Sequence, residues 1–245
     1  MIEGVKTVVY IKTMLPDKPF YLIRHAESEA NAASLAAGGE MDSPLSARGK
    51  EQAIALAPYL ETIEPQPVRI YHSPMTRVKQ TATLIADRLN LDFLEYEDLR
   101  EHRLGDWNGV PWPEILPKLE AREEPPNGET EEVFTKRVRS VFKDILEHCD
   151  DGIPLIVAHG GVFHALGYIY KYAMTPIQNC HLHYFEPYPE NADFPWRSWH
   201  YDLAGDGVYR KSAPFCPTST DEKIDRSQSF AKMVEITKAA REETG

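Results

Sequence analysis

Residues 20–31 read FYLIRHAESEAN, and the large apolar residues Phe20–Ile23 run directly into an arginine and a histidine. A short apolar run of this kind is typical of a strand that is buried on both faces of a parallel sheet. In open parallel sheets, ligands bind beyond the carboxyl ends of the strands. We therefore expect Arg24 and His25 to stand at a sheet edge where a ligand binds.

Segments of strand and helix character alternate outward from this run. Further strands or extended segments are expected at 68–74, 91–99, 153–158 and 179–186. Strands that alternate with amphipathic helices are typical of an α/β sheet. The sequence therefore predicts an α/β three-layer sandwich, in which helices cover both faces of a mostly parallel sheet.

The helices between these strands have start signals and apolar stripes. Ser46 is the predicted N-cap of one helix, which Pro58 should kink or end. Ser73 is the predicted N-cap of the next, with Pro74 at its first position. Two apolar stripes have the spacing of amphipathic helices: Val78, Ala82, Ile85 and Leu89, and then Phe134, Val138, Val141 and Ile145.

The alternation of strands and helices also suggests how the chain is organised. Residues 1–18 read as an N-terminal extension with a β-branched run that could form an edge strand. Residues 19–186 carry the alternation and form the predicted catalytic domain, with a lid insertion at 100–129 that is rich in Gly and Pro. Residues 187–245 are predicted to form a C-terminal extension that packs on the body, with a helix at 227–243.

Composition argues against several classes of partner. The formal net charge of −11 disfavours a nucleic acid or an anionic membrane as the main partner. No apolar stretch approaches the roughly 20 residues that span a membrane, and the N-terminus lacks a signal-peptide pattern. Three widely spaced cysteines indicate neither a disulfide framework nor a zinc cluster, so we expect a cytoplasmic protein with free thiols. An anion site in this chain must be a local positive pocket.

Chemically matched side chains follow several of the expected strands. Arg77 falls in the first turn of the helix after the second strand, and Glu101 follows the run at 91–99. His159 ends the run at 153–158, and the glycine pair that begins at Gly160 lets the backbone turn sharply into a helix. Together with the first strand, these ends supply two guanidinium groups, two imidazoles and one carboxylate. Guanidinium groups bind paired phosphate oxygens, so the set suits a phosphate dianion.

Six blocks of sequence resemble the ordered motifs of the histidine phosphatase (phosphoglycerate mutase-like) superfamily. They are LIRHAES, DSPLSARGKEQA, YHSPMTRVKQTA, LREHRLGDWNG, PNGET and IVAHGG. The resemblance covers about Pro19 to Glu186 and points to the phosphatase branch. One departure is Ala26, where the family often has glycine.

The resemblance implies that His25 is a nucleophile that forms a phosphohistidine and that Glu101 is the proton donor. The residues implied to bind the phosphate are Arg24, Asn31, Arg77, His159 and Gly160. A histidine attacks phosphorus only when neutral, and nearby arginines should lower its pKa from the usual ~6.5. A bound phosphate dianion would favour protonated Glu101, which could then protonate the leaving alkoxide. Neither a metal nor another cofactor is needed for this chemistry.

Some candidates have simpler explanations. Arg77 taken alone could be a surface arginine, and His72 could line the pocket or merely finish its strand. The spacing from Glu101 to Gly105 favours Glu101 as the acid over its acidic neighbours, which are Glu95, Glu97 and Asp98.

Three functions remain open from the sequence. The first is a phosphomonoester hydrolase that acts on a small phosphorylated molecule through a phosphohistidine. The second is a phosphoglycerate mutase. Mutases of the family carry extra basic residues after the acid, whereas in the segment 117–129 Glu120, Glu123 and Glu124 outnumber Lys118 and Arg122. The third is a catalytically silent phosphate-binding module, against which the intact set of side chains argues. Trp107 and Trp112 could stack on a leaving group or form the lid core, and the oligomeric state, a homodimer included, is open.

Overall fold

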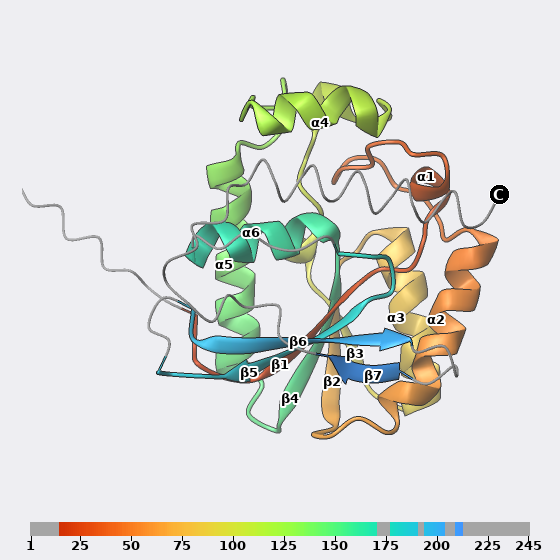
Figure 1. The fold of residues 1–245 in the computed structure, drawn as a ribbon, viewed down its shortest axis with the longest axis vertical. Helices are drawn as coiled ribbons and strands as arrows, with labels where there is room; N and C mark the ends of the chain where they lie inside the picture. The colour runs from red at the N-terminus through yellow and green to blue at the C-terminus, as the bar shows by residue number, and fades with distance from the viewer. Residues whose placement is uncertain (1–14, 171–176, 191–193, 204–208, 213–245) are drawn as a thin grey trace, which may run out of the picture.

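A seven-stranded sheet in the order β3-β2-β4-β1-β5-β6-β7 forms the middle layer (Figure 1). The computed structural model describes residues 15–170, 177–190, 194–203 and 209–212. The strands are β1 (Phe20–Arg24), β2 (Pro67–His72), β3 (Phe93–Glu95), β4 (Ile153–Ala158), β5 (Leu182–Pro187), β6 (Trp196–Leu203) and β7 (Tyr209–Ser212). The edge strand expected in the N-terminal extension and the helix expected at 227–243 lie outside the described residues.

Four adjacent strands, β1 to β4, run parallel to one another, and β5, β6 and β7 continue the sheet in antiparallel pairs. The predicted α/β fold with a mostly parallel sheet is therefore confirmed. β6 and β7 lie where the sequence showed no strand pattern. The stretch that forms β6, WRSWHYDL, mixes aromatic, hydroxyl and charged residues. It pairs with β5 from Trp196 to Tyr201, and its residues Trp196 and Tyr201 are buried in the two cores.

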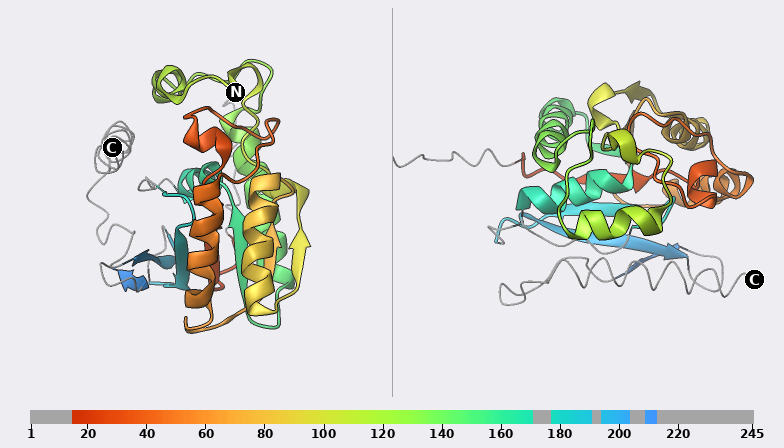
Figure 2. Two further views of the ribbon diagram at one scale, coloured as in Figure 1. Left: turned by 90° about the vertical axis from the view of Figure 1, so that its right-hand side faces the viewer. Right: turned by 90° about the horizontal axis from the view of Figure 1, so that it is seen from above.

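Helices cover both faces of the sheet, as Figure 2 shows. The described α-helices are α1 (Glu29–Ala32), α2 (Ala47–Leu60), α3 (Thr76–Leu89), α4 (Trp112–Glu120), α5 (Glu131–His148) and α6 (Gly160–Tyr170). Alternation along β1 separates two cores: Tyr21 and Ile23 pack with α2 and α3, whereas Phe20 and Leu22 pack with α5 and α6. None of the described helices is long and apolar enough to cross a bilayer.

The predicted helix starts were correct at α2 and wrong at α3. Ser46 caps α2 by accepting a hydrogen bond from the Gly49 amide at 2.9 Å. Pro58 lies in the last turn of α2, which ends two residues later. α3 begins only at Thr76, after Met75, so Ser73 is not its N-cap. The Ser73 hydroxyl bonds a histidine on another strand end instead.

The predicted lid insertion, 100–129, holds the short 3-10 helix Gly105–Trp107 and helix α4, which lies above the rest of the domain in Figure 1. Trp107 is buried in a small separate cluster of the lid, and Trp112 packs against the same cluster. Of the two explanations for these tryptophans, the lid core is the one observed. The Glu40 carboxylate anchors the lid, because it accepts hydrogen bonds from the Leu104 and Gly105 amides at 3.1 and 3.0 Å.

Candidate active site

His25 lies directly after β1 and is almost fully buried. Its Nδ1 lies 2.7 Å from the Ala26 carbonyl oxygen, so Nδ1 carries the proton and donates it to that oxygen. The Nε2 atom then holds a lone pair, and the Arg77 Nε–H donates to it at 3.3 Å. The local geometry thus selects the tautomer in which Nε2 is the nucleophilic atom.

Arg77 is a buried cation at the start of α3, with 1% of its surface exposed. Its guanidinium donates to the carbonyl oxygens of Met41 at 3.0 Å and Ala37 at 3.1 Å. Burial lowers its pKa to about 10, while the charge of Glu101 acts in the opposite direction. Arg77 therefore remains a cation at neutral pH, and it is a buried residue beside His25 and not a surface arginine.

His159 follows β4 and faces His25, with ring centroids 5.3 Å apart. Its Nε2 lies 2.8 Å from the Ser73 Oγ. Among the described residues, His159 Nδ1 and Arg24 Nε are buried nitrogens without a hydrogen-bond partner. Buried polar atoms are usually paired, so two unpaired nitrogens at adjacent strand ends indicate a place where a ligand accepts hydrogen bonds.

The electrostatics keep both imidazoles neutral. Burial lowers the pKa of His25 well below its usual value, and the charges of Arg77 and Arg24 lower it further. The pKa of His159 is lowered for the same reasons, burial first. The sequence predicted the effect of the arginines, but burial is the larger cause.

The Glu101 carboxylate is held by two backbone amides. It accepts from Gly161 N at 3.1 Å and from His102 N at 2.9 Å. A Cβ on Gly161 would lie 2.1 Å from Glu101 Oε1, so a larger residue there would force the Glu101 carboxylate to move. A Cβ on Gly160 would lie 3.5 Å from Arg24 Nε, which is an ordinary contact.

Asn31 has a structural contact that the sequence did not suggest. Its Oδ1 accepts from the Ser28 amide at 3.2 Å in a capping box of α1, and also from Asn179 Nδ2 at 3.1 Å. The same Asn179 Nδ2 lies 3.0 Å from the carbonyl oxygen of His25. Asn31 is therefore tied to the His25 backbone through Asn179, a residue that sequence reasoning missed because no pattern marks it.

His72 is fully buried at the end of β2, and its Nδ1 contacts the Ser73 carbonyl oxygen at 2.9 Å. Its ring packs near Phe93, with centroids 5.4 Å apart. Of the two explanations for His72, packing at the strand end is the one observed. Within the described ranges, no three His, Cys, Asp or Glu side chains are grouped so that they could hold a metal ion.

A model of the histidine phosphatase superfamily (branch 1) matches residues 20–193. The chain belongs to this superfamily. The match begins at β1 and includes Arg24, His25, Arg77, Glu101 and His159. The family resemblance seen in the sequence is therefore confirmed.

Characterised and uncharacterised members of the superfamily are similar to this chain. The phosphatase PhoE of Bacillus subtilis (strain 168), itself uncharacterised, is 34% identical over 145 residues, which cover 59% of this chain and 73% of PhoE. The probable phosphoglycerate mutase GpmB of Enterobacter sp. (strain 638) is 29% identical, over 76% of this chain and 92% of GpmB. A mycobacterial glucosyl-3-phosphoglycerate phosphatase, solved in complex with VO3, superposes with a TM-score of 0.64 and 25% identity, over 74% of this chain and 97% of that one.

Proposed function

We propose that this protein is a metal-independent phosphomonoester hydrolase that works through a phosphohistidine on His25. The observation that carries the proposal is the neutral, buried His25 imidazole, whose Nε2 lone pair receives the Arg77 N–H. The unpaired nitrogens of Arg24 and His159 beside it supply donors for phosphoryl oxygens. That a related phosphatase was solved in complex with VO3 supports binding of an oxyanion by this chain.

The first chemical step forms the phosphohistidine. The Nε2 lone pair of His25 attacks phosphorus, the ester P–O bond breaks, and its electron pair passes to the leaving oxygen. That oxygen takes the proton of Glu101. Arg24 and Arg77 stabilise the charge on the equatorial oxygens during the in-line transfer.

The second step returns the enzyme to its starting state. Water attacks phosphorus, and the ionised Glu101 takes one of its protons. The P–N bond breaks, its electron pair returns to His25 Nε2, and inorganic phosphate leaves. Glu101 is reprotonated in this step and can act as the acid again.

A mutase is the second candidate, because GpmB is among the relatives. A mutase substrate brings a carboxylate and a second phosphate, which need additional cations. In the lid, Lys118 lies over the Trp107 ring at 5.4 Å, and Glu123 and Glu124 are exposed. This lid supports hydrolysis of a monophosphate over mutase activity.

The test is an assay of the purified protein on 4-nitrophenyl phosphate and on an alkyl phosphate, with and without a chelator. We expect turnover that a chelator leaves unchanged and that His25→Ala abolishes, together with an acid-labile phosphoenzyme in rapid-quench samples. Arg48→Lys, at an exposed position on α2, is the control variant. Phosphoryl exchange on 3-phosphoglycerate with negligible hydrolysis would favour the mutase, and phosphate binding without turnover would favour a silent module.

A further inference from the structure

We propose that Arg137 is a positioning residue for the acid Glu101, and that Arg137 and Glu129 together form a clamp on the segment that carries it. Nothing in the sequence motifs assigns a role to Arg137, which lies on α5 outside the phosphate site. The inference rests on the proposed function, because it concerns how the proton donor of that reaction is held.

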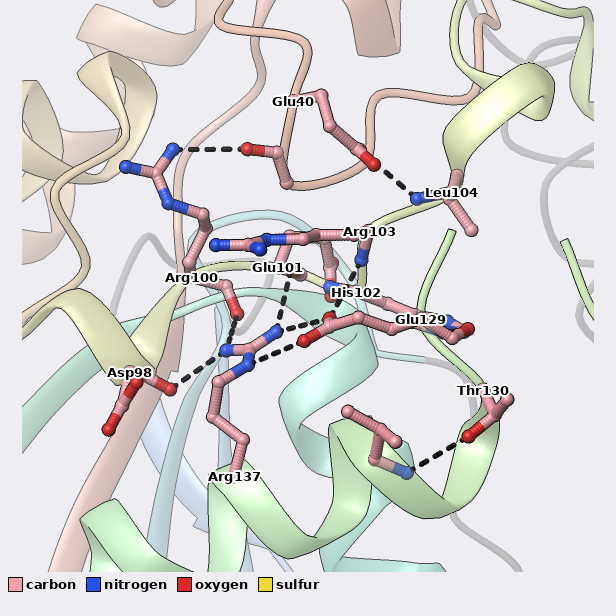
Figure 3. Close-up of polar contacts among 12 residues, drawn as sticks. Glu40, Asp98, Arg100, Glu101, His102, Arg103, Leu104, Glu129, Thr130 and Arg137 are labelled. Atoms are coloured by element: carbon pink, nitrogen blue, oxygen red, sulfur yellow. Dashed lines mark hydrogen bonds and ion pairs between the residues drawn. The ribbon is translucent and has the colours of Figure 1, made fainter. Parts of the chain in front are cut away.

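Arg137 binds backbone oxygens on both sides of the acid (Figure 3). Its Nη1 donates to the carbonyl oxygens of Asp98 at 2.9 Å and Arg100 at 2.8 Å. Its Nη2 donates to the carbonyl oxygen of Glu101 at 3.2 Å. One guanidinium therefore satisfies three carbonyls in a segment that has no regular secondary structure at Glu101.

Glu129 completes the clamp from the lid side. Its carboxylate receives Arg137 Nε at 2.9 Å and Nη2 at 2.6 Å, and the two side chains are only 14% and 10% exposed. The same carboxylate accepts from the Arg103 amide at 3.0 Å, and the Glu129 carbonyl oxygen contacts His102 Nε2 at 2.7 Å. Burial is the largest single influence on Glu129 and raises its pKa, but the hydrogen bonds from Arg137 and the Arg103 amide, together with the charge of Arg137, hold the pKa below its usual value. Paired, charge-assisted bonds of this kind fix geometry strongly.

The clamp acts on the acid through one peptide group. The peptide between Glu101 and His102 presents its oxygen to Arg137 and its N–H to the Glu101 carboxylate itself. Arg137 thus fixes the plane of the peptide whose N–H orients the acid. A misplacement of about 1 Å in a catalytic group can cost 10²-fold in rate, so a loss of this plane should be visible in kcat.

The experiment compares two substrates that differ in their need for an acid. The leaving alkoxide of an alkyl phosphate needs a proton, whereas 2,4-dinitrophenolate leaves without one. Glu101 also acts as the base in the second step, which both substrates share, so the quantity compared is kcat/KM, which reports the step in which the leaving group departs. We expect Arg137→Met to lower kcat/KM for the alkyl phosphate about 10²-fold and to lower kcat/KM for 2,4-dinitrophenyl phosphate less than about threefold. Lysine keeps the positive charge but lacks the planar set of N–H donors of a guanidinium, so the loss in Arg137→Lys should be smaller than in Arg137→Met.

Lys136→Met is the matched control, because Lys136 is the adjacent residue on α5 and is exposed in an ion pair with Glu132. It should leave both substrates unchanged. Equal losses of kcat/KM on the two substrates in Arg137→Met, or no loss in a folded variant, would overturn the inference. If Arg137→Met does not fold, Glu129→Gln takes its place as the test variant, because it removes the ion pair. Its loss of kcat/KM should also be larger on the alkyl phosphate than on 2,4-dinitrophenyl phosphate, but the difference should be smaller than in Arg137→Met.

Failure of the proposed function would look different. A wild-type protein that hydrolyses neither substrate would refute the hydrolase itself, and the clamp with it. Glu101→Gln should reproduce the selectivity of Arg137→Met. Equal losses of kcat/KM on both substrates in Glu101→Gln would refute Glu101 as the acid, and the positioning role with it, while the hydrolase remained.

Discussion

The hydroxyl of Ser73 lies 2.8 Å from Nε2 of His159, and both side chains are fully buried. If Ser73 donates to Nε2, the proton of the neutral imidazole resides on Nδ1, the atom that has no partner among the described residues. The Ser73 hydroxyl then fixes the tautomer in which the Nδ1–H of His159 can donate to a phosphoryl oxygen.

Ser73→Ala should lower kcat/KM about tenfold, because the tautomer of His159 is no longer fixed. Inhibition by inorganic phosphate should weaken by a similar factor. The control is Ser140→Ala, at an exposed position on α5. Unchanged phosphate inhibition in Ser73→Ala would show that the hydroxyl does not orient the ring.

Gly161→Ala should lower kcat on an alkyl phosphate by about 10²-fold, because the new Cβ and the Glu101 carboxylate cannot occupy their present positions. Gly160→Ala is the matched comparison, and its Cβ meets Arg24 only at ordinary contact distance. We expect its loss to stay within tenfold. Steady-state kinetics measure the loss of kcat in both variants, and circular dichroism verifies that they fold. Similar losses of kcat in the two variants would contradict the steric argument.

Arg77→Lys should lower kcat/KM by about 10²- to 10³-fold, because a lysine cannot contact His25 and two carbonyl oxygens in one plane. The melting temperature should also fall, since the carbonyls of Ala37 and Met41 lose buried partners. Kinetics and thermal unfolding measure the two effects. Activity within threefold of wild type would remove Arg77 from the proposed mechanism.

The lowered pKa values of His25 and His159 predict how stability depends on pH. Below the unfolded-state pKa of about 6.5, the two imidazoles bind protons in the unfolded chain but stay neutral in the native state. The free energy of unfolding therefore falls with decreasing pH. Above that value the contribution is fully present. Denaturant titrations from pH 5 to pH 7.5 should therefore show stability rising up to about pH 6.5 and then levelling.

The variant His25→Gln should show a shallower rise over the same interval. The remainder belongs to His159 and to His183, whose pKa is lowered mainly by burial. Identical slopes in wild type and variant would mean that His25 is not held neutral by the fold.

Much of the fold could be predicted from patterns that repeat within a few residues. The apolar run before Arg24 indicated a buried strand, and strand ends in a parallel sheet meet at one edge, which is why separated motifs could be expected to converge. The start of α3 was misplaced because Ser73 bonds a histidine 86 positions away, which no local pattern reveals. β6 was missed because charged and hydroxyl residues interrupt its aromatic ones, although Trp196 and Tyr201 are buried in the cores. Arg137 was missed because three of its partners are backbone oxygens, which any sequence provides, and its side-chain partner Glu129 lies outside α5, eight positions away.

The loop from Ala37 to Met41 serves two parts of the molecule at once. Its carbonyl oxygens hold the Arg77 guanidinium, and the carboxylate of Glu40, between them, holds the lid at Leu104 and Gly105. Anyone who grafts a foreign lid onto this scaffold to change its selectivity must therefore transplant these five loop positions with it. A replacement loop of the same length that lacks Glu40 would keep the carbonyl oxygens that hold Arg77 but would lose the hydrogen bonds that hold the lid.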